Sequence, residues 1–268
     1  MCLIAVSMGA HPRWRFVLVG NRDEFHARPT APAASLDAEG RRFGGRDLQA
    51  GGGWLQVDAG GRVAAVTNVR LGLAEAATRS RGALAADFIA TAAPVDAYAQ
   101  ALMPVAAEFG RFNLLLFDAA EQAEAGRYVS NHPSALTRVL PTGIHALSNA
   151  DLDTPWPKTL ALHARLATWA ARADARDPDH SAVLAPLFEA LADPREAPDE
   201  ALPSTGVAIE WERRLSAAFI VGADYGTRAS TVVLVSDEGL WFEERRFSPN
   251  GVVEGRSATW LPRRGDRI

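Results

Sequence analysis

The sequence predicts an α+β fold in which sheet layers are sandwiched between helices. Short apolar runs bounded by turn residues, typical of strands, occupy both ends of the chain, while helical spacing of apolar residues occupies the middle. No linker or repeat divides the 268 residues, 48% of which are apolar. A chain of this length can bury its own core without disulfides, so we expect one domain over residues 1–268.

The N-terminal part is expected to form strands joined by tight turns. A turn at residues 11–12 favours antiparallel pairing of the first two apolar runs, and the glycines at 60–61 predict a hairpin. The proline-rich residues 28–33 and the glycines at 51–53 break the strand pattern, so we expect loops there. The predicted strands of this part are residues 3–8, 14–19, 54–57 and 63–67.

The middle of the chain carries helical spacing. It predicts two helices between residues 78 and 109 with an interruption at Pro94, a long helix after residue 157, and another near 183–191. Asp153 or Thr154 is the expected N-cap of the long helix. The polar, proline-rich residues 193–206 predict a surface loop. Further strands are expected at residues 112–117, 128–129, 137–140, 144–147, 218–221, 231–235 and 241–247.

Charge and composition exclude several classes of protein. The formal net charge is −4, whereas a general nucleic-acid footprint needs a basic domain, so we expect no nucleic-acid partner. One cysteine excludes an internal disulfide, and the six histidines show no paired metal-ligand spacing, so we expect no metal site. The apolar opening is too short for a signal segment or a membrane span, which predicts a cytoplasmic protein. The oligomeric state stays open.

Cys2 is the first candidate for chemistry. Removal of Met1 leaves a cysteine with a free α-amine, whose pKa of about 7.7–8.0 suits a base acting on its own thiol. One residue then supplies both nucleophile and base. The alternative is a small buried residue that begins an inner strand.

The polar segment from Asn21 to Glu24 follows the second strand. Antiparallel pairing of the first two strands places Cys2 opposite the Val19–Arg22 end of the second strand, so these four polar residues lie within a side chain or two of the thiol. An arginine there lowers the pKa of a thiol, and an aspartate can hold the α-amine, so Arg22 and Asp23 are candidate catalytic residues. Asn21 is a candidate ligand-binding residue. The alternative is a surface ion pair with Asn21 in a turn.

Two further asparagines follow apolar strands. The side-chain amides of Asn68 and Asn149 can donate to a developing oxyanion, although turns and helix caps also use asparagine. Arg70 and Arg228 are candidate anion-binding residues near the same strand ends. His26 can ligate haem iron, but a lone histidine is more often a surface or hydrogen-bonded residue.

Several motifs together carry a family resemblance. They are Met1-Cys2-Leu3-Ile4, Asn21-Arg22-Asp23-Glu24-Phe25, the glycine-rich run from Gly45 to Leu55, Thr67-Asn68-Val69-Arg70, Leu147-Ser148-Asn149, Pro155-Trp156-Pro157-Lys158 and the run from Tyr225 to Thr231. The chain resembles the NRDE family, also called the transport and Golgi organisation protein 2 family, over nearly its whole length.

The resemblance implies a four-layer αββα sandwich of two antiparallel sheets, the N-terminal-nucleophile (Ntn) hydrolase-like fold. It suggests comparison with penicillin V acylase and bile-salt hydrolases. Those enzymes carry Gly-Arg-Asn, a spacer and Asp after the second strand, whereas the order here is Gly-Asn-Arg-Asp from residue 20. Carried over by motif, the implied roles are Cys2 as nucleophile, Arg22 and Asp23 as its partners, Asn68 and Asn149 as oxyanion donors, and Arg228 as a cavity cation.

Three functions follow as hypotheses. The first is a cysteine amidohydrolase that acts on a small linear amide and requires no cofactor. The second is a non-enzymatic carrier that binds haem or an acyl-CoA-like or lipid-like anion in the same cavity, because relatives of this family are linked with haem mobilisation, acyl-CoA metabolism and secretory organisation. The third is an interaction protein on an inactive hydrolase fold, since a fold alone does not determine an activity.

Overall fold

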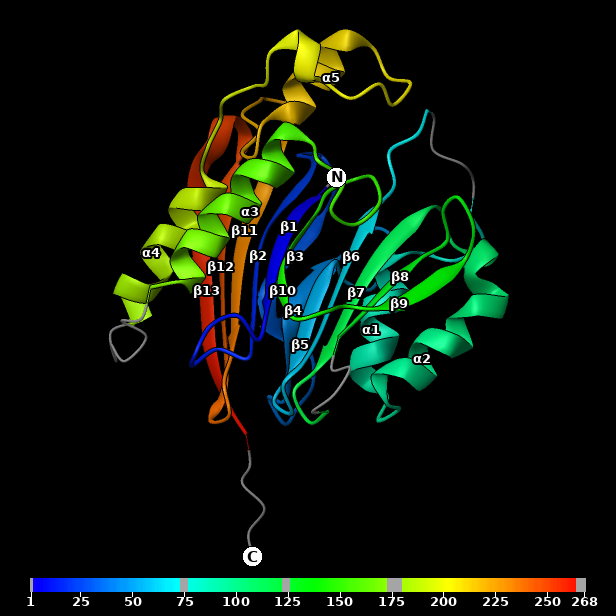
Figure 1. The fold of residues 1–268 in the computed structure, drawn as a ribbon, viewed down its shortest axis with the longest axis vertical. Coiled ribbons are helices and arrows are strands. Elements are labelled where there is room, and N and C mark those ends of the chain that lie inside the picture. The colour runs from blue at the N-terminus through cyan, green and yellow to red at the C-terminus, as the bar shows by residue number, and fades with distance from the viewer. Residues whose placement is uncertain (1, 73–76, 122–125, 173–179, 264–268) are drawn as a thin grey trace, which may run out of the picture.

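Two antiparallel sheets face each other in the computed structural model, which describes residues 2–72, 77–121, 126–172 and 180–263 (Figure 1). The first, sheet A, has the strand order β10-β1-β2-β11-β12-β13. Its strands are β1 (Cys2–Met8), β2 (Phe16–Phe25), β10 (Gly143–Leu147), β11 (Tyr225–Val235), β12 (Gly239–Ser248) and β13 (Val252–Pro262).

The second, sheet B, has the consecutive order β3-β4-β5-β6-β7-β8-β9. Each of its strands pairs with the next one along the chain, so it is a meander. Its strands are β3 (Thr30–Ser35), β4 (Arg42–Asp47), β5 (Leu55–Asp58), β6 (Arg62–Asn68), β7 (Phe112–Asp118), β8 (Gly126–Ser130) and β9 (Leu136–Val139).

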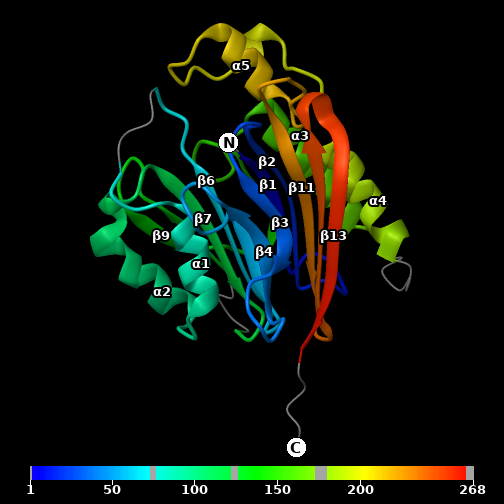
Figure 2. The ribbon, with the colours of Figure 1, turned by 180° about the vertical axis from the view of Figure 1, so that it is seen from behind.

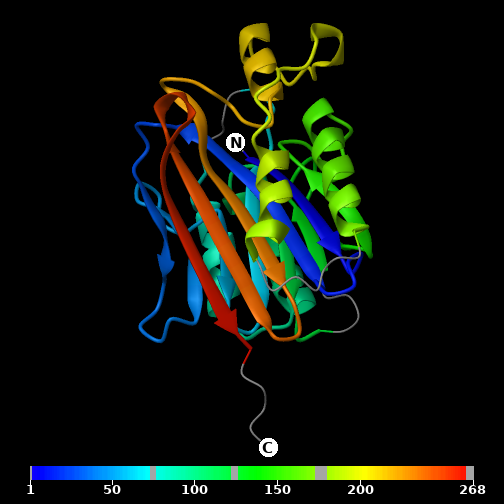
Figure 3. The same ribbon diagram turned by 90° about the vertical axis from the view of Figure 1, so that its left-hand side faces the viewer.

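Helices cover the outer faces of both sheets (Figures 2 and 3). Helices α1 (Gly82–Ala90) and α2 (Val95–Leu102) lie on sheet B, while α3 (Pro157–Ala170) and α4 (His180–Leu191) lie on sheet A. A shorter helix, α5 (Ile209–Ser216), sits over one end of sheet A. Short 3₁₀ helices occupy Met103–Glu108, Asp199–Ala201 and Pro249–Gly251. The layer order confirms the predicted αββα sandwich.

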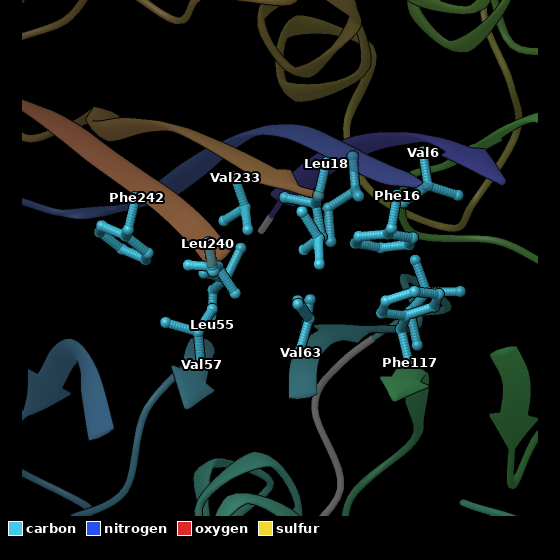
Figure 4. Packing of buried hydrophobic residues seen from close by; sticks show 14 of the residues in the cluster. Val6, Phe16, Leu18, Leu55, Val57, Val63, Phe117, Val233, Leu240 and Phe242 are labelled. Atoms are coloured by element: carbon cyan, nitrogen blue, oxygen red, sulfur yellow. The ribbon is translucent and has the colours of Figure 1, made fainter. Parts of the chain in front are cut away.

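Three apolar clusters hold the four layers together. The one between the sheets interleaves side chains from both, and the rings of Phe16 and Phe117 stack there with centroids 4.4 Å apart (Figure 4). A second cluster joins sheet A to α3 and α4, and a third joins sheet B to α1 and α2. Because side chains alternate along a strand, β1 and β2 feed the first two clusters in turn.

The structure corrects several predicted elements. The proline-rich residues expected to form a loop contain β3, where the pairing with β4 shifts register between Ala31 and Ala34. Pro32 falls within this irregularity on an edge strand, which is where a sheet tolerates proline. The predicted strand at 218–221 belongs to neither sheet. The sequence did not predict strand β4, helix α5 or strand β13.

Asp153 does not cap α3, and neither does Thr154. The N-cap of this helix is Trp156, with no side-chain capping bond. Asp153 has a positive φ of 60° and accepts hydrogen bonds from the backbone of Ala146 and, at 2.8 Å, pairs with Nδ1 of His145. Its carboxylate therefore ties the segment before α3 to strand β10.

Candidate functional site

The pairing of β1 with β2 sets Cys2 directly opposite Arg22, within the strand end that the sequence predicted. Directly opposed residues of an antiparallel pair project from the same face of the sheet. Ile4 and Val6, which follow Cys2 on alternate positions, pack in the cluster between the sheets. Cys2 and Arg22 therefore project between the sheets, at the end where that apolar core stops.

A cavity of about 530 Å³ occupies this end of the space between the sheets. Sheet A contributes Cys2 and Arg22, and sheet B contributes Asn68 at the end of β6. Gly51, Gly53 and Gly82, the first residue of α1, close another wall. At position 52 a Cβ would lie 2.3 Å from the backbone of Gly82, and φ is +72°, so only glycine fits there.

The Cys2 thiol is buried in the wall of the cavity. Burial raises the pKa of this thiol, and the nearby positive charge of Arg22 acts in the opposite direction. The carbonyl oxygen of Cys2 accepts a hydrogen bond from Ser148 Oγ at 3.0 Å, which fixes the start of β1 against the residue after β10. A thiol in this environment needs a base to become a nucleophile.

Of the two predicted oxyanion donors, the structure brings only Asn68 to the cavity. Asn149 is fully buried behind it, and its Nδ2 donates to the backbone oxygen and to Oδ1 of Asn68, both at 3.0 Å. Because its Oδ1 is engaged, Asn68 is oriented with its NH₂ group available to a ligand. Asn149 thus orients the side chain of Asn68 and does not itself line the cavity.

The structure does not bring Asn21 to the cavity. Its side chain points to the helix side of sheet A, where Nδ2 donates to the carbonyls of Leu191 and Ala218 at 2.8 and 2.7 Å. Its Oδ1 accepts from Ser230 Oγ at 2.6 Å. All of these bonds are buried, so Asn21 connects β2 to α4, to the segment after α5 and to β11.

Asp23 shares this helix-facing side of the strand but lies at its open end, where it also borders the cavity. Its Oδ1 accepts a hydrogen bond from Thr227 Oγ1 at 2.7 Å, across the β2–β11 pairing. Burial raises the pKa of this carboxyl, whereas the positive charge of Lys158 acts to lower it. Asp23 therefore approaches the start of β1 from behind the cavity wall.

Arg22 and Arg28 converge on one carboxylate at the cavity floor. Arg28 Nε lies 2.6 Å from Asp47 Oδ2, and Arg22 Nη2 lies 3.5 Å from the same oxygen. Arg22 Nη1 also donates to Thr30 Oγ1 at 3.3 Å. These contacts hold the Arg22 guanidinium against sheet B on the Cys2 side of the cavity.

Arg228 borders the cavity, whereas His26 is not among the described lining residues. Arg228 sits where the β2–β11 register shifts, and its Nη1 donates to the carbonyls of Phe25, His26 and Arg28. It therefore holds the loop after β2 in place. Burial and the charge of Arg228 lower the pKa of His26.

Arg70 also lies outside the cavity lining. It is buried near α5, with Nη2 3.1 Å from Glu212 Oε2 and its guanidinium 4.8 Å from the ring centroid of Trp156. Its backbone N–H donates to the carbonyl of Asn149 at 2.7 Å. Its contacts make it a link between the end of β6 and α5.

The sequence reasoning missed Lys158 and Arg81. Lys158 is buried on α3. The sequence does single this residue out, because it is the only lysine beside 27 arginines. Arg81 precedes α1, lines the cavity and donates to the carbonyl of Arg111 at 3.2 Å. Nothing in the sequence distinguished Arg81 from the other arginines. Both charges nevertheless act on the Cys2 thiol.

Within the described ranges, no cluster of three or more histidine, cysteine, aspartate or glutamate side chains could hold a metal ion. No helix in the same part of the chain has the length and apolar character needed to cross a membrane. Met1, on whose removal the proposed chemistry of Cys2 depends, lies outside the described residues.

Two solved structures resemble this fold at low scores. One is the Caenorhabditis elegans N-acylethanolamine-hydrolyzing acid amidase orthologue, with a TM-score of 0.47 and 13% identity, covering 87% of this chain and 92% of that one. The other is the C2A mutant of conjugated bile acid hydrolase from Clostridium perfringens, with a TM-score of 0.44 and 8% identity, covering 97% and 92%.

Sequence similarity to curated proteins is stronger. The bovine Transport and Golgi organization protein 2 homolog is 32% identical over 259 residues, covering 91% of this chain and 92% of that protein. The human homolog is 28% identical over 272 residues, covering 97% and 98%. The model of the family described as Transport and Golgi organisation 2 matches residues 1–249. The chain therefore belongs to the Transport and Golgi organisation 2 family.

Proposed function

We propose that this protein is a cysteine amidohydrolase in which Cys2, exposed as the N-terminal residue by removal of Met1, attacks a small linear amide. The observation that carries the proposal is the position of Cys2. Its thiol lies in the wall of a cavity large enough for a small molecule, directly across from Arg22 and within the same cavity as Asn68.

The first half of the reaction forms an acyl-enzyme. The free α-amine of Cys2 takes the thiol proton, and the sulfur attacks the carbonyl carbon of the amide. Asn68 Nδ2 donates to the oxygen that becomes negative. The α-ammonium then gives its proton to the leaving nitrogen as the C–N bond breaks, which leaves a thioester on Cys2.

The second half returns the enzyme to its starting state. The α-amine takes a proton from water, whose oxygen attacks the thioester carbon, and the same amide group of Asn68 holds the second oxyanion. Collapse of this intermediate releases a carboxylic acid and restores the thiol. Asp23 orients the α-amine throughout, because its carboxylate lies behind the start of β1.

The test is hydrolysis of a panel of N-acyl amides of increasing acyl length by purified protein, with Cys2→Ser and Cys2→Ala as paired variants. We expect turnover by the natural protein, a loss of at least about 10³-fold in Cys2→Ala, and a partial loss in Cys2→Ser, which keeps a weaker nucleophile. Equal turnover by all three proteins would contradict the proposal.

A second candidate function is the binding of an amphipathic acyl-CoA-like anion without turnover. Arg46 and Arg81 both line the cavity, and within the described residues neither has a carboxylate within 4.0 Å. Guanidinium groups left without a carboxylate suit a phosphate or carboxylate of a ligand. Calorimetric titration with palmitoyl-CoA tests this function: binding that persists in Cys2→Ser supports it, and the absence of saturable binding removes it.

Haem fits the site poorly. No histidine is among the described residues that line the cavity, and the predicted iron ligand His26 lies outside it. Cys2 carries the one thiol there, and in the proposed reaction this thiol is the nucleophile rather than an iron ligand. We therefore derive no step through haem, and a haemin titration followed by absorbance serves as a comparison for the palmitoyl-CoA experiment.

A further inference from the structure

Four charged side chains are buried together on the helix side of sheet A, behind Cys2. They are Asp23 on β2, Arg70 after β6, Lys158 on α3 and Glu212 on α5. None is more than 6% exposed. Burial of a charge is costly unless another charge balances it, so the pairing within this group matters.

Arg70 and Glu212 form one closed pair. Their guanidinium and carboxylate lie 3.1 Å apart, and the other carboxylate oxygen of Glu212 accepts from both the backbone and the hydroxyl of Thr205. This leaves one anion and one cation, Asp23 and Lys158. If only one of these two is ionised, the group carries a net buried charge, so the ionisation of Asp23 and that of Lys158 are coupled.

Lys158 is held in the layer that Asp23 faces. Its Nζ donates to the carbonyl of Leu215, near the end of α5, at 2.8 Å. Among the described residues no carboxylate lies within 4.0 Å of Nζ, so this ammonium has no direct ion pair. Asp23 points into the same layer because side chains alternate along β2 and Asn21, two residues earlier, contacts α4.

The two groups act on each other across this layer. Asp23 is the strongest charge acting on Lys158, and Lys158 is the strongest charge acting on Asp23. Burial lowers the pKa of Lys158 to about 8, with Asp23 opposing that effect and Arg70 adding to it. Cys2 and Glu212 are the other charged groups that face this ammonium.

We propose that Lys158 is a positioning residue of the Cys2 site. Its ammonium lies on the helix side of sheet A, where it balances the charge of the buried Asp23 carboxylate and keeps that carboxylate ionised near the start of β1. It touches no substrate and acts through Asp23. The proposal rests on the proposed function for the role of the α-amine, but the balance between Lys158 and Asp23 can be measured without any substrate.

The chain offers a direct reporter, because Lys158 is its only lysine. Protein labelled with ¹³C-lysine gives a single side-chain Cε signal, whose chemical shift follows the charge of Nζ through a pH titration. We expect a midpoint of about 8 in the natural protein. In Asp23→Asn the midpoint should fall by about one unit or more, because the anion that holds the proton on Nζ is gone.

Two outcomes of this titration overturn the proposal. One is a midpoint that Asp23→Asn leaves unchanged, which means that the two charges do not balance each other. The other is a midpoint that rises in Asp23→Asn, which means that the Asp23 carboxylate does not hold the proton on Nζ. Asp193→Asn is the matched control, because that carboxylate pairs with Arg195 at the surface and should not move the midpoint.

A second measurement separates positioning from a merely structural role. The rate of Cys2 alkylation by iodoacetamide is followed against pH in the natural protein, Lys158→Met and Lys158→Arg. Loss of the cation in Lys158→Met should shift the profile to higher pH and slow alkylation at least about threefold at neutral pH, or roughly half a pKa unit. Lys158→Arg should restore the profile.

An unshifted profile in a folded Lys158→Met protein overturns the proposal, since Lys158 then serves only to hold the end of α5. If Lys158→Met does not fold, the Cε titration and the Lys158→Arg profile still decide the matter. Failure of the proposed function would show separately, as absent amide turnover with the Lys158–Asp23 coupling intact.

Discussion

Alternate residues of the segment from Asn21 to Glu24 meet two different environments. Arg22 and Glu24 project into a cavity that a ligand can enter, whereas Asn21 projects into the buried layer between sheet A and its helices, and Asp23 faces that layer where it meets the edge of the cavity. Arg22 reaches from sheet A to the side chains of Thr30 and Asp47 on sheet B. Asn21 instead donates to the buried backbone carbonyls of Leu191 and Ala218.

A run of four polar residues on a strand is therefore not one site. The strand pleat assigns the members of the run to two tasks, since neighbours on a strand face opposite ways. Changes on the cavity face should alter chemistry and binding while the fold persists. Changes on the helix face should alter the stability of the fold or the ionisation of Asp23.

The largest expected effect is the loss of stability in Asn21→Leu. The substitution leaves the carbonyls of Leu191 and Ala218 and the hydroxyl of Ser230 buried without partners, at about 1–3 kcal/mol each. We expect the free energy of unfolding in urea to fall by at least about 3 kcal/mol. The paired cavity-face variant Arg22→Gln should lose less stability, because the Asp47 carboxylate keeps its closer partner Arg28, and equal losses would remove the distinction between the faces.

The next effect concerns catalysis. Asn68→Ala removes the one predicted oxyanion donor that reaches the cavity, so kcat/KM for an amide should fall about 10²–10³-fold, or about 2.7–4 kcal/mol of barrier. Urea unfolding should change little, because Asn68 is only half-buried. Asn149→Ala is the contrasting variant and should cost more stability than Asn68→Ala; the reverse order in both assays would contradict the assigned roles.

The pH dependence of stability gives a third, smaller effect. Between pH 8 and 10.5 the folded protein has released the Lys158 proton while the unfolded chain still holds it. The unfolded state then binds more protons, so this residue makes stability rise with pH, by at most about 1.4 kcal/mol per pH unit. Urea unfolding of the natural protein minus Lys158→Met should show this rise, and a flat difference would argue against a buried ammonium.

The smallest effect belongs to the cavity rim. Arg46 is exposed and has no described carboxylate partner, so Arg46→Gln should weaken palmitoyl-CoA binding only about threefold, as expected for a solvated charge. Calorimetry at two salt concentrations should show the difference shrinking as salt rises. Arg41→Gln, an exposed arginine that does not line the cavity, should bind as the natural protein does.

Much of the fold followed from the sequence, because local patterns encode it. The alternation and turns of the first two strands predicted the pairing that sets Cys2 opposite Arg22, and helical spacing predicted α1 to α4. The proline-rich β3 and the polar α5 escaped prediction. Their pairing and packing depend on neighbours distant in the chain rather than on local pattern.

The assignment of the candidate site was less complete for the same reason. The partners of Asn21 lie 170 and 197 residues away, so its side-chain direction could not be read from its neighbours. Arg70 was expected to bind a ligand, but its position depends on Glu212 of α5. Lys158 is the only lysine of the chain, yet only the packing of α3 against sheet A places it behind Cys2.

The central claim is that Cys2 presents a thiol and a free α-amine to the cavity. Intact-mass measurement with N-terminal sequencing of the purified natural protein tests this most directly. We expect a chain that lacks Met1 and begins with an unmodified Cys2. A chain that retains Met1 would contradict it, because the α-amine would then belong to another residue and could not act as the base for the Cys2 thiol.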